Sequence, residues 1–219
     1  MVYLIGCDHR KAQTYRNNSE LADPENSTQF EFKAIVANAI RKHHPLLVAE
    51  EMHMDILKAT QRRSVAAEAA VEAGVPHRCC DPNWDEREAL GIEDDLPFLG
   101  PSVPSEWVRK IGTEREAMLH DIAHRWAVRE KFWIKQLGED INRPLLFICG
   151  DGHRWTLRRR VEALGIAVAV IGKKLGAAPM SPEYFDAYRQ VRYYGFPPET
   201  GCFCVGGSSI PCFSEVSVR

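Results

Sequence analysis

Residues 144–171 begin with Pro144-Leu-Leu-Phe-Ile-Cys149-Gly150-Asp151-Gly152-His153 and continue through an Arg-rich helical pattern to Gly165 and a second apolar run, 166–171. An unbroken apolar run that ends in glycine and leads directly into a helical pattern is typical of a parallel strand buried on both faces. His153 is therefore expected at the carboxyl end of a central strand. Open α/β sheets bind their ligands at those strand ends.

The N-terminus repeats this arrangement. Residues 2–5 form a short apolar run that leads into Gly6-Cys7-Asp8-His9. Two Gly-x-x-His motifs thus follow two predicted strands that are far apart in sequence, and sheet topology can place them side by side. We predict an α/β fold in which helices flank a mainly parallel central sheet, with the site at the carboxyl ends of the strands.

A further predicted strand, from Pro45, ends in the adjacent carboxylates Glu50 and Glu51. Neighbouring residues of a strand point to opposite faces, so only one of the two is expected to face the Gly-x-x-His motifs. The sequence leaves open which one. Residues 75–81 are predicted to form a third strand, and Asp81 at its end either serves the same site or starts a turn before Pro82.

Arg129 lies within the apolar stripe of a long helix predicted from Thr113 to Leu137. A cation on an apolar face requires a partner. That partner is either a carboxylate, with Glu50 and Glu51 as candidates, or an anionic substrate or transition state. The cluster 158–160, three consecutive arginines, covers most of a helical turn and predicts a solvated surface.

Composition limits the class of protein. The chain has 219 residues, 45% of them hydrophobic, and this length and composition favour a single globular domain (1–219). Its net charge of -2 argues against nucleic-acid binding. We expect a lid or irregular excursion at 83–112 and a C-terminal arm at 195–219. The seven cysteines, including Cys202, Cys204 and Cys212, are expected to be reduced. No apolar run is long enough to span a bilayer, so a cytoplasmic protein without a membrane partner is predicted.

Two imidazoles and one or two carboxylates on rigid strand ends are ligands suited to Zn, Mn or Co. We predict His9, His153 and Glu51 as metal ligands, and Glu50, Glu51 and Arg129 as catalytic groups. In this reading a divalent metal acidifies water, a spare glutamate acts as general base, and the arginine stabilises the transition state.

The order of these motifs resembles the Tiki/TraB/PrgY family, within the wider group of erythromycin esterases and ChaN haem-binding proteins. That pattern comprises two Gly-x-x-His motifs, a glutamate after the second core strand, and an arginine about twenty residues before the second motif. The resemblance covers 2–171 by motif only, and it implies a metal-dependent hydrolase of peptides or esters with His9, Glu50 or Glu51, Arg129 and His153 in its site. The chain departs from the family pattern in the residues between glycine and histidine, Cys7-Asp8 and Asp151.

Two alternatives stay open. One is a protein that binds haem, metal or a peptide in the same site without turnover, and the other is a metal-free esterase in which a histidine acts as general base. A small peptide or ester is the expected substrate. The C-terminal arm is expected to form a terminal hairpin or to pack on a second copy of the chain in a homodimer.

Overall fold

The computed structural model describes residues 1–16, 28–92 and 125–171. All of these except Arg125 belong to one compact unit, built from 1–94 and 126–179. The prediction of a single domain and the predicted C-terminal arm involve residues outside the described ranges. The thiols at 202, 204 and 212 lie outside them as well.

A five-stranded sheet forms the centre of this unit, with strand order β5-β3-β6-β1-β7. The strands are β1 (Val2–Cys7), β3 (Leu47–Glu50), β5 (His77–Cys79), β6 (Leu145–Gly150) and β7 (Val168–Val170). Every pairing between them is parallel. The predicted parallel α/β fold is therefore confirmed. A separate antiparallel pair joins β2 (Thr14–Tyr15) to β4 (Arg63–Ser64).

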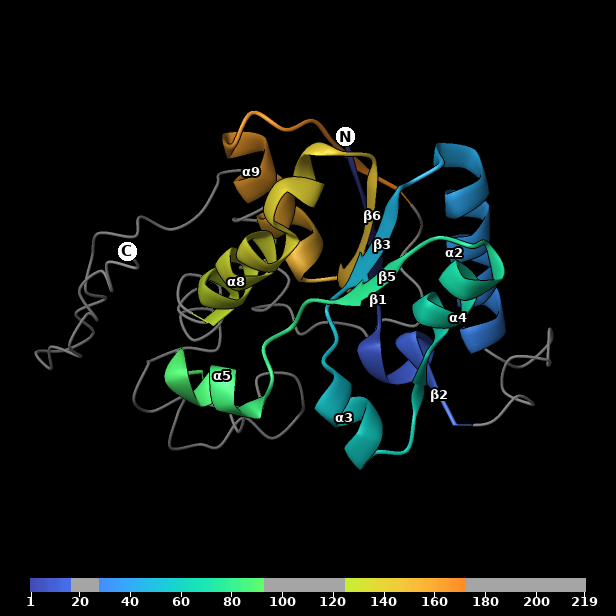
Figure 1. Ribbon diagram of the computed structural model, residues 1–219, viewed down its shortest axis with the longest axis horizontal. Helices are drawn as coiled ribbons and strands as arrows, with labels where there is room; N and C mark the ends of the chain where they lie inside the picture. Colours follow the sequence, from blue (N-terminus) through green and yellow to red (C-terminus); the bar gives the residue numbers. More distant parts are fainter. Residues whose placement is uncertain (17–27, 93–124, 172–219) are drawn as a thin grey trace, which may run out of the picture. The chain divides into compact units, whose positions relative to one another are not determined.

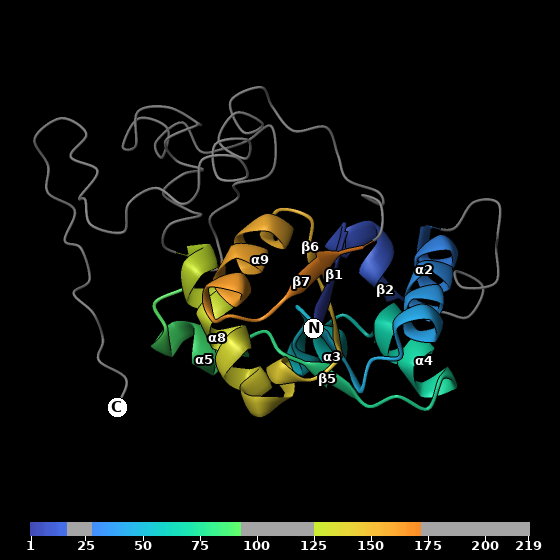
Figure 2. The ribbon, with the colours of Figure 1, turned by 90° about the horizontal axis from the view of Figure 1, so that it is seen from above.

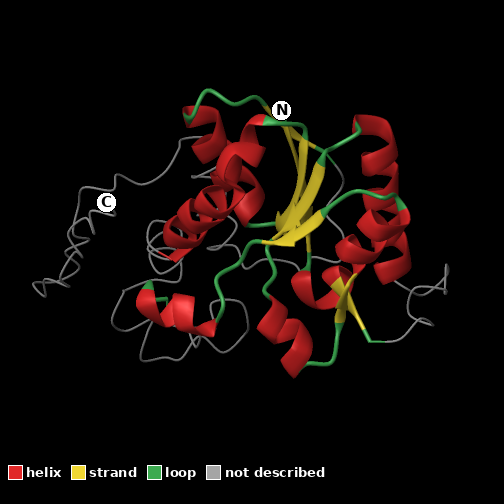
Figure 3. Cartoon of the chain, in the orientation of Figure 1, coloured by secondary structure: helices red, strands yellow, loops and turns green. Residues whose placement is uncertain are grey.

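Helices cover both faces of the sheet (Figures 1 and 3). On one face lie α2 (Thr28–His43) and α4 (Val65–Glu72), and on the other lie α8 (Ala127–Leu137) and α9 (His153–Ala163). The same two layers are visible from above in Figure 2. The short elements are η1 (His9–Gln13), α3 (Met54–Ala59), α5 (Trp84–Ala89) and η3 (Gly138–Asn142).

Strand residues alternate between two cores, as the period of a strand requires. Ile5, Val48 and Ile148 pack with α2 and α4, whereas Leu4 and Phe147 pack with α8 and α9. The central strand β6 is buried at all six positions, which explains its continuous apolar sequence.

Several helix ends follow from local sequence. Ser64 caps α4, accepting a hydrogen bond from the Ala67 N–H at 3.0 Å, and Gly74 follows this helix with a φ of +67°. Asn83 and Glu86 form a capping box at the start of α5. Residues 84–89 are therefore helical, where an irregular excursion was expected. Residues 93–112 of that expected lid lie outside the described residues, as does the first part of the helix predicted from Thr113.

Candidate functional site

The two Gly-x-x-His motifs meet because β1 and β6 are neighbouring strands. Their register places Gly6 opposite Cys149 and Cys7 opposite Gly150. His9 then begins η1, a single π-helical turn, while His153 begins α9. Strand β3 lies on the other side of β6, so Glu51 leaves the sheet beside both motifs. The carboxyl ends of three adjacent strands thus supply the predicted metal ligands.

Each motif glycine packs against the other motif. A Cβ atom added at Gly150 would lie 2.5 Å from His9 Nε2, and one added at Gly6 would lie 2.7 Å from Asp151 Oδ1. Both distances are shorter than a normal van der Waals contact. The absence of a side chain at Gly6 and Gly150 therefore lets the two strand ends approach one another with His9 and Asp151 in their observed positions.

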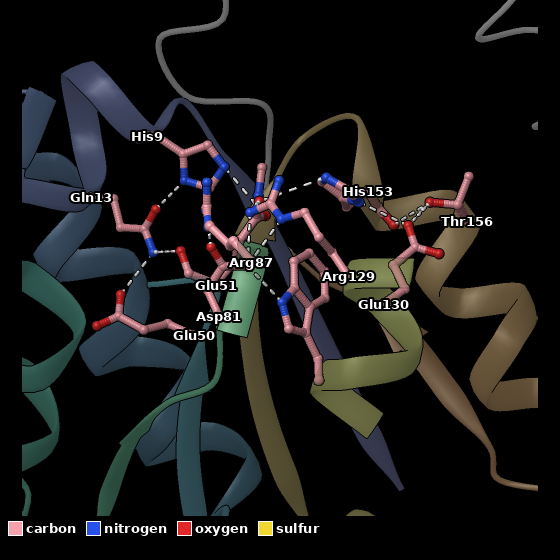
Figure 4. A network of polar contacts seen from close by, with 12 residues as sticks. His9, Gln13, Glu50, Glu51, Asp81, Arg87, Arg129, Glu130, His153 and Thr156 are labelled. Carbon is pink, nitrogen blue, oxygen red and sulfur yellow. Dashed lines mark hydrogen bonds and ion pairs between the residues drawn. The ribbon is translucent and has the colours of Figure 1, made fainter. Parts of the chain in front are cut away.

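Glu51 lies at the centre of the site (Figure 4), with a side chain only 2% exposed. Its Oε2 accepts a hydrogen bond from the Gly150 N–H at 2.7 Å and lies 3.2 Å from His9 Nε2. Its Oε1 accepts from Arg129 Nη2 at 2.5 Å and lies 3.6 Å from His153 Nε2. The Nε2 atoms of both histidines are thus within reach of one carboxylate, each near a different oxygen.

The other ring nitrogen of His9 is fixed by Gln13. The Gln13 Nε2 donates to the backbone oxygen of Glu51 at 3.1 Å and to Glu50 Oε2 at 2.8 Å. A backbone carbonyl can only accept, so the amide oxygen of Gln13 must face His9 Nδ1, which it contacts. His9 therefore carries a proton on Nδ1, and Nε2 is the nitrogen that can offer a lone pair.

His153 is held in the same way by Glu130, whose side chain is fully buried. Glu130 accepts from His153 Nδ1 at 2.8 Å and from Arg160 Nε at 2.7 Å, and it also binds the Thr156 hydroxyl. The ring of His153 packs against the indoles of Trp126 and Trp133, with centroid distances of 4.4 and 4.8 Å. Its Nε2 is thereby directed toward Glu51.

Arg129 has two carboxylate partners. It donates from Nε and Nη2 to Asp81 Oδ1 at 3.0 and 2.8 Å, in addition to its bond with Glu51. Asp81 also accepts from Trp133 Nε1 at 2.8 Å and pairs with Arg87. Of the two partners weighed from the sequence, the structure places Glu51 against Arg129, and it adds Asp81 from the end of β5.

Glu50 points to the opposite face of the sheet, as alternation along a strand requires. It contacts Gln13 and His77, whose Nε2 lies 2.9 Å from Glu50 Oε1. The structure therefore brings together His9, Glu51, Arg129 and His153, and it separates Glu50 from them.

Charge pairing shifts the pKa values of the central groups. Burial lowers the pKa of His9, but the Glu51 carboxylate outweighs burial and raises it to about 9. Because the His9 side chain is 39% exposed, burial lowers its pKa by less than the ion pair with Glu51 raises it. Burial raises the pKa of Glu51, yet His9, His153 and Arg129 together hold it well below its usual value.

Sequence reasoning missed several of the supporting residues. One of them is Gln13, which follows His9 by four positions, a spacing that places two residues on one face of a helical turn. The prediction of a solvated arginine cluster is wrong for Arg160, whose side chain is 11% exposed and binds Glu130. Nothing local in the sequence marks that pair, because the two residues lie on different helices.

No family model, curated protein or solved structure matches the chain. The likeness to the Tiki/TraB/PrgY pattern consequently rests on the motifs alone. Among the helices in the described ranges, none has the length and apolar character needed to cross a membrane.

Proposed function

We propose that this protein is a metal-dependent hydrolase of amide or ester bonds. His9 Nε2, His153 Nε2 and the Glu51 carboxylate would hold a divalent Zn, Mn or Co ion. The observation that carries the proposal is the convergence of the two Nε2 atoms on one carboxylate while both Nδ1 atoms are bound elsewhere. Metal-binding histidines have this arrangement, in which the second nitrogen donates to a carboxylate or carbonyl.

The chemistry of these three donors suits such an ion. Two imidazoles and a carboxylate suit Zn, Mn and Co, and three protein ligands leave further positions open. A bound ion of this kind supplies polarisation of a carbonyl and acidification of water.

The chain's own groups would orient the reaction. Glu51 is kept ionised by its cationic neighbours, and Arg129, held by Asp81, fixes one of its oxygens. Arg129 also places a positive charge beside the site, where negative charge develops on a carbonyl oxygen under attack. Glu50 faces the opposite side of the sheet, so we assign it no direct part in the reaction.

Access is expected from the side of His9. The His9 side chain is 39% exposed, whereas His153 is buried against two tryptophans. His9 must give up its Nε2 proton before it can donate a lone pair to an ion. A substrate carbonyl would thus enter beside His9, with His153 and Glu51 forming the inner wall of the site.

The metal-free esterase is the second candidate, because the exposed His9 could contact water directly. A general base must be unprotonated, however. With its pKa raised to about 9, His9 is the free base in only about 1% of metal-free molecules at pH 7. An ion that binds in place of this proton would compensate for its loss, whereas the metal-free mechanism has no such compensation.

The test is hydrolysis of a panel of short peptides and aryl esters by protein loaded with Zn, Mn or Co and by chelated protein. Activity is expected only in the loaded protein and is expected to be lost in Glu51→Gln. His44→Asn, an exposed substitution beyond the last residue of α2, serves as the matched control and should keep activity. Hydrolysis that persists after chelation would establish the metal-free mechanism. Retained metal without any hydrolysis would establish a binding protein.

A further inference from the structure

A second group of metal-ligating side chains lies on the opposite face of the sheet from Glu51. Strands β3 and β5 pair in parallel, with Val48 opposite His77 and Glu50 opposite Cys79. Side chains two positions apart on a strand share a face, so His77 and Cys79 both project on the side of Glu50. All three positions are on rigid strands.

The three donor atoms are close together. One ligand atom from each of Glu50, His77 and Cys79 lies within 4.8 Å of the other two. Glu50 Oε1 is 2.9 Å from His77 Nε2, while Glu50 Oε2 is anchored by Gln13 Nε2 at 2.8 Å. Cys79 Sγ lies 3.9 Å from Met54 Sδ, so a second sulfur borders the group.

Charge provides an independent reason to expect a cation here. Within the described ranges, each of the other buried carboxylates is paired with an arginine: Glu51 and Asp81 with Arg129, Glu130 with Arg160, and Asp151 with Arg154. Glu50 is 0% exposed, and its side-chain partners in the same ranges are the neutral amide of Gln13 and the imidazole of His77. No arginine or lysine in these ranges pairs with Glu50, and a buried carboxylate is costly unless a cation lies beside it. A bound cation would supply that charge.

We propose that Glu50, His77 and Cys79 form a second metal site, which binds a thiophilic divalent ion of the Zn²⁺ type. Thiolate and imidazole are preferred zinc ligands, and a carboxylate completes a three-residue set. The donors differ from those of the first site, because only the second contains sulfur. The site does not depend on hydrolysis at Glu51.

Metal binding at Cys79 requires loss of the thiol proton to solvent. Burial raises the pKa of the Cys79 thiol to about 12, so the thiol keeps its proton until a cation takes its place. His77 has a partly exposed side chain, which gives an ion a route from solvent.

The site would stabilise the end of an edge strand. Among the strands that the structure describes, β5 pairs only with β3, and Asp81 lies two residues beyond its end. An ion bound to Glu50, His77 and Cys79 would join the two strands just before Asp81, the residue that holds Arg129. Gln13 also links Glu50 to His9, so the two sites share one hydrogen-bonded residue.

Cobalt absorption tests the proposal, since a thiolate ligand gives Co²⁺ an intense near-ultraviolet charge-transfer band that nitrogen and oxygen ligands do not. Reduced full-length protein is titrated with Co²⁺ as wild type, Cys79→Ser, and the control Cys80→Ser, whose thiol packs in the other core. The band is expected in wild type and Cys80→Ser, lost in Cys79→Ser, and displaced by Zn²⁺. It is also expected in His9→Ala, which removes a ligand of the first site only.

Two outcomes would overturn the proposal: no charge-transfer band in the wild type, or a band of undiminished intensity in Cys79→Ser. Circular dichroism of the metal-free variants checks that they fold. If Cys79→Ser does not fold, His77→Gln takes its place. That variant is expected to weaken zinc binding by about 10-fold or more in competition with a chelator, because it removes a ligand. Unchanged zinc affinity in His77→Gln would count equally against the site.

Discussion

Substitution of Gly150 by alanine tests how closely the two motifs pack. The added methyl carbon would lie 2.5 Å from His9 Nε2 and 3.4 Å from Glu51 Oε2. Carbon atoms in ordinary contact are about 3.5 Å or more from their neighbours. The His9 ring must therefore move by about 1 Å, which breaks its 3.2 Å approach to Glu51.

The effect on stability is expected to be small. The His9 side chain is 39% exposed and can swing toward solvent to relieve the clash. Alanine also reduces the conformational freedom of the unfolded chain, which offsets about 0.4–1 kcal/mol of the remaining strain. The free energy of unfolding should consequently change by less than about 1 kcal/mol. A misplacement of about 1 Å, in contrast, lowers catalytic efficiency on the order of 100-fold.

Gly165→Ala is the matched control. Gly165 has a φ of +78°, where alanine is strained, but no atom lies within 4 Å of its added Cβ. This variant should lose about 1 kcal/mol of stability and keep its metal and activity. Urea unfolding, metal titration and kcat/KM are measured for both variants. A folded Gly150→Ala protein with wild-type metal affinity and activity would refute the packing argument.

Three further predictions concern the groups around the site. Glu130→Leu removes the acceptor of His153 Nδ1 and breaks the buried ion pair with Arg160, so we expect a loss of about 3–5 kcal/mol in urea unfolding and a 10- to 100-fold weaker metal affinity. Unchanged affinity would contradict this role. Arg129→Met leaves two buried carboxylates without their shared cation, and calorimetry should show a melting temperature lower by several degrees, on the order of 2–4 °C for each kcal/mol lost. A melting temperature within 1 °C of the wild type, on the order of experimental error, would argue against the buried ion pair. The metal-free protein should be most stable between about pH 4.5 and 6.5. Because the pKa of His9 is raised, its contribution to the free energy of unfolding is complete below pH 6.5 and is lost as the pH rises through about 9. Because the pKa of Glu51 is lowered, its contribution is present above pH 4.5 and is lost in acid. A melting temperature that rises from pH 6.5 to 9 would contradict the His9 assignment.

Features with a local cause were predicted correctly from the sequence. Strands buried on both faces have continuous apolar sequences, and the apolar run before Gly150 is sufficient to predict β6. The opposite orientation of Glu50 and Glu51 follows from strand period. Which of them meets the histidines required the strand order, because β3 had to lie beside β6 with Glu51 toward α8 and α9. The helix α5 could also have been predicted, since Asn83 and Glu86 have capping-box spacing.

The supporting contacts could not be predicted in the same way. Glu130 and Arg160 lie on different helices, and their pairing depends on how α8 and α9 pack. A charged triplet on a helix ordinarily indicates a solvated surface. The triplet of arginines in α9 departs from this rule, because Arg160 pairs with Glu130, the carboxylate that orients His153. The close approach of Gly150 to His9 likewise arises only when β1 and β6 pair in the folded sheet.

The most direct measurement of the central claim is metal content by plasma mass spectrometry in a Cys79→Ser background, which removes the thiol of the second site. Protein is purified without chelator and reconstituted with Zn, Mn or Co, with and without His9→Ala or His153→Ala. His44→Asn in the same background is the control. We predict that each of the two histidine variants loses the same single equivalent of metal, and that the control keeps it. Metal retained in either histidine variant, or no uptake after reconstitution, would contradict the claim that His9 and His153 bind one ion.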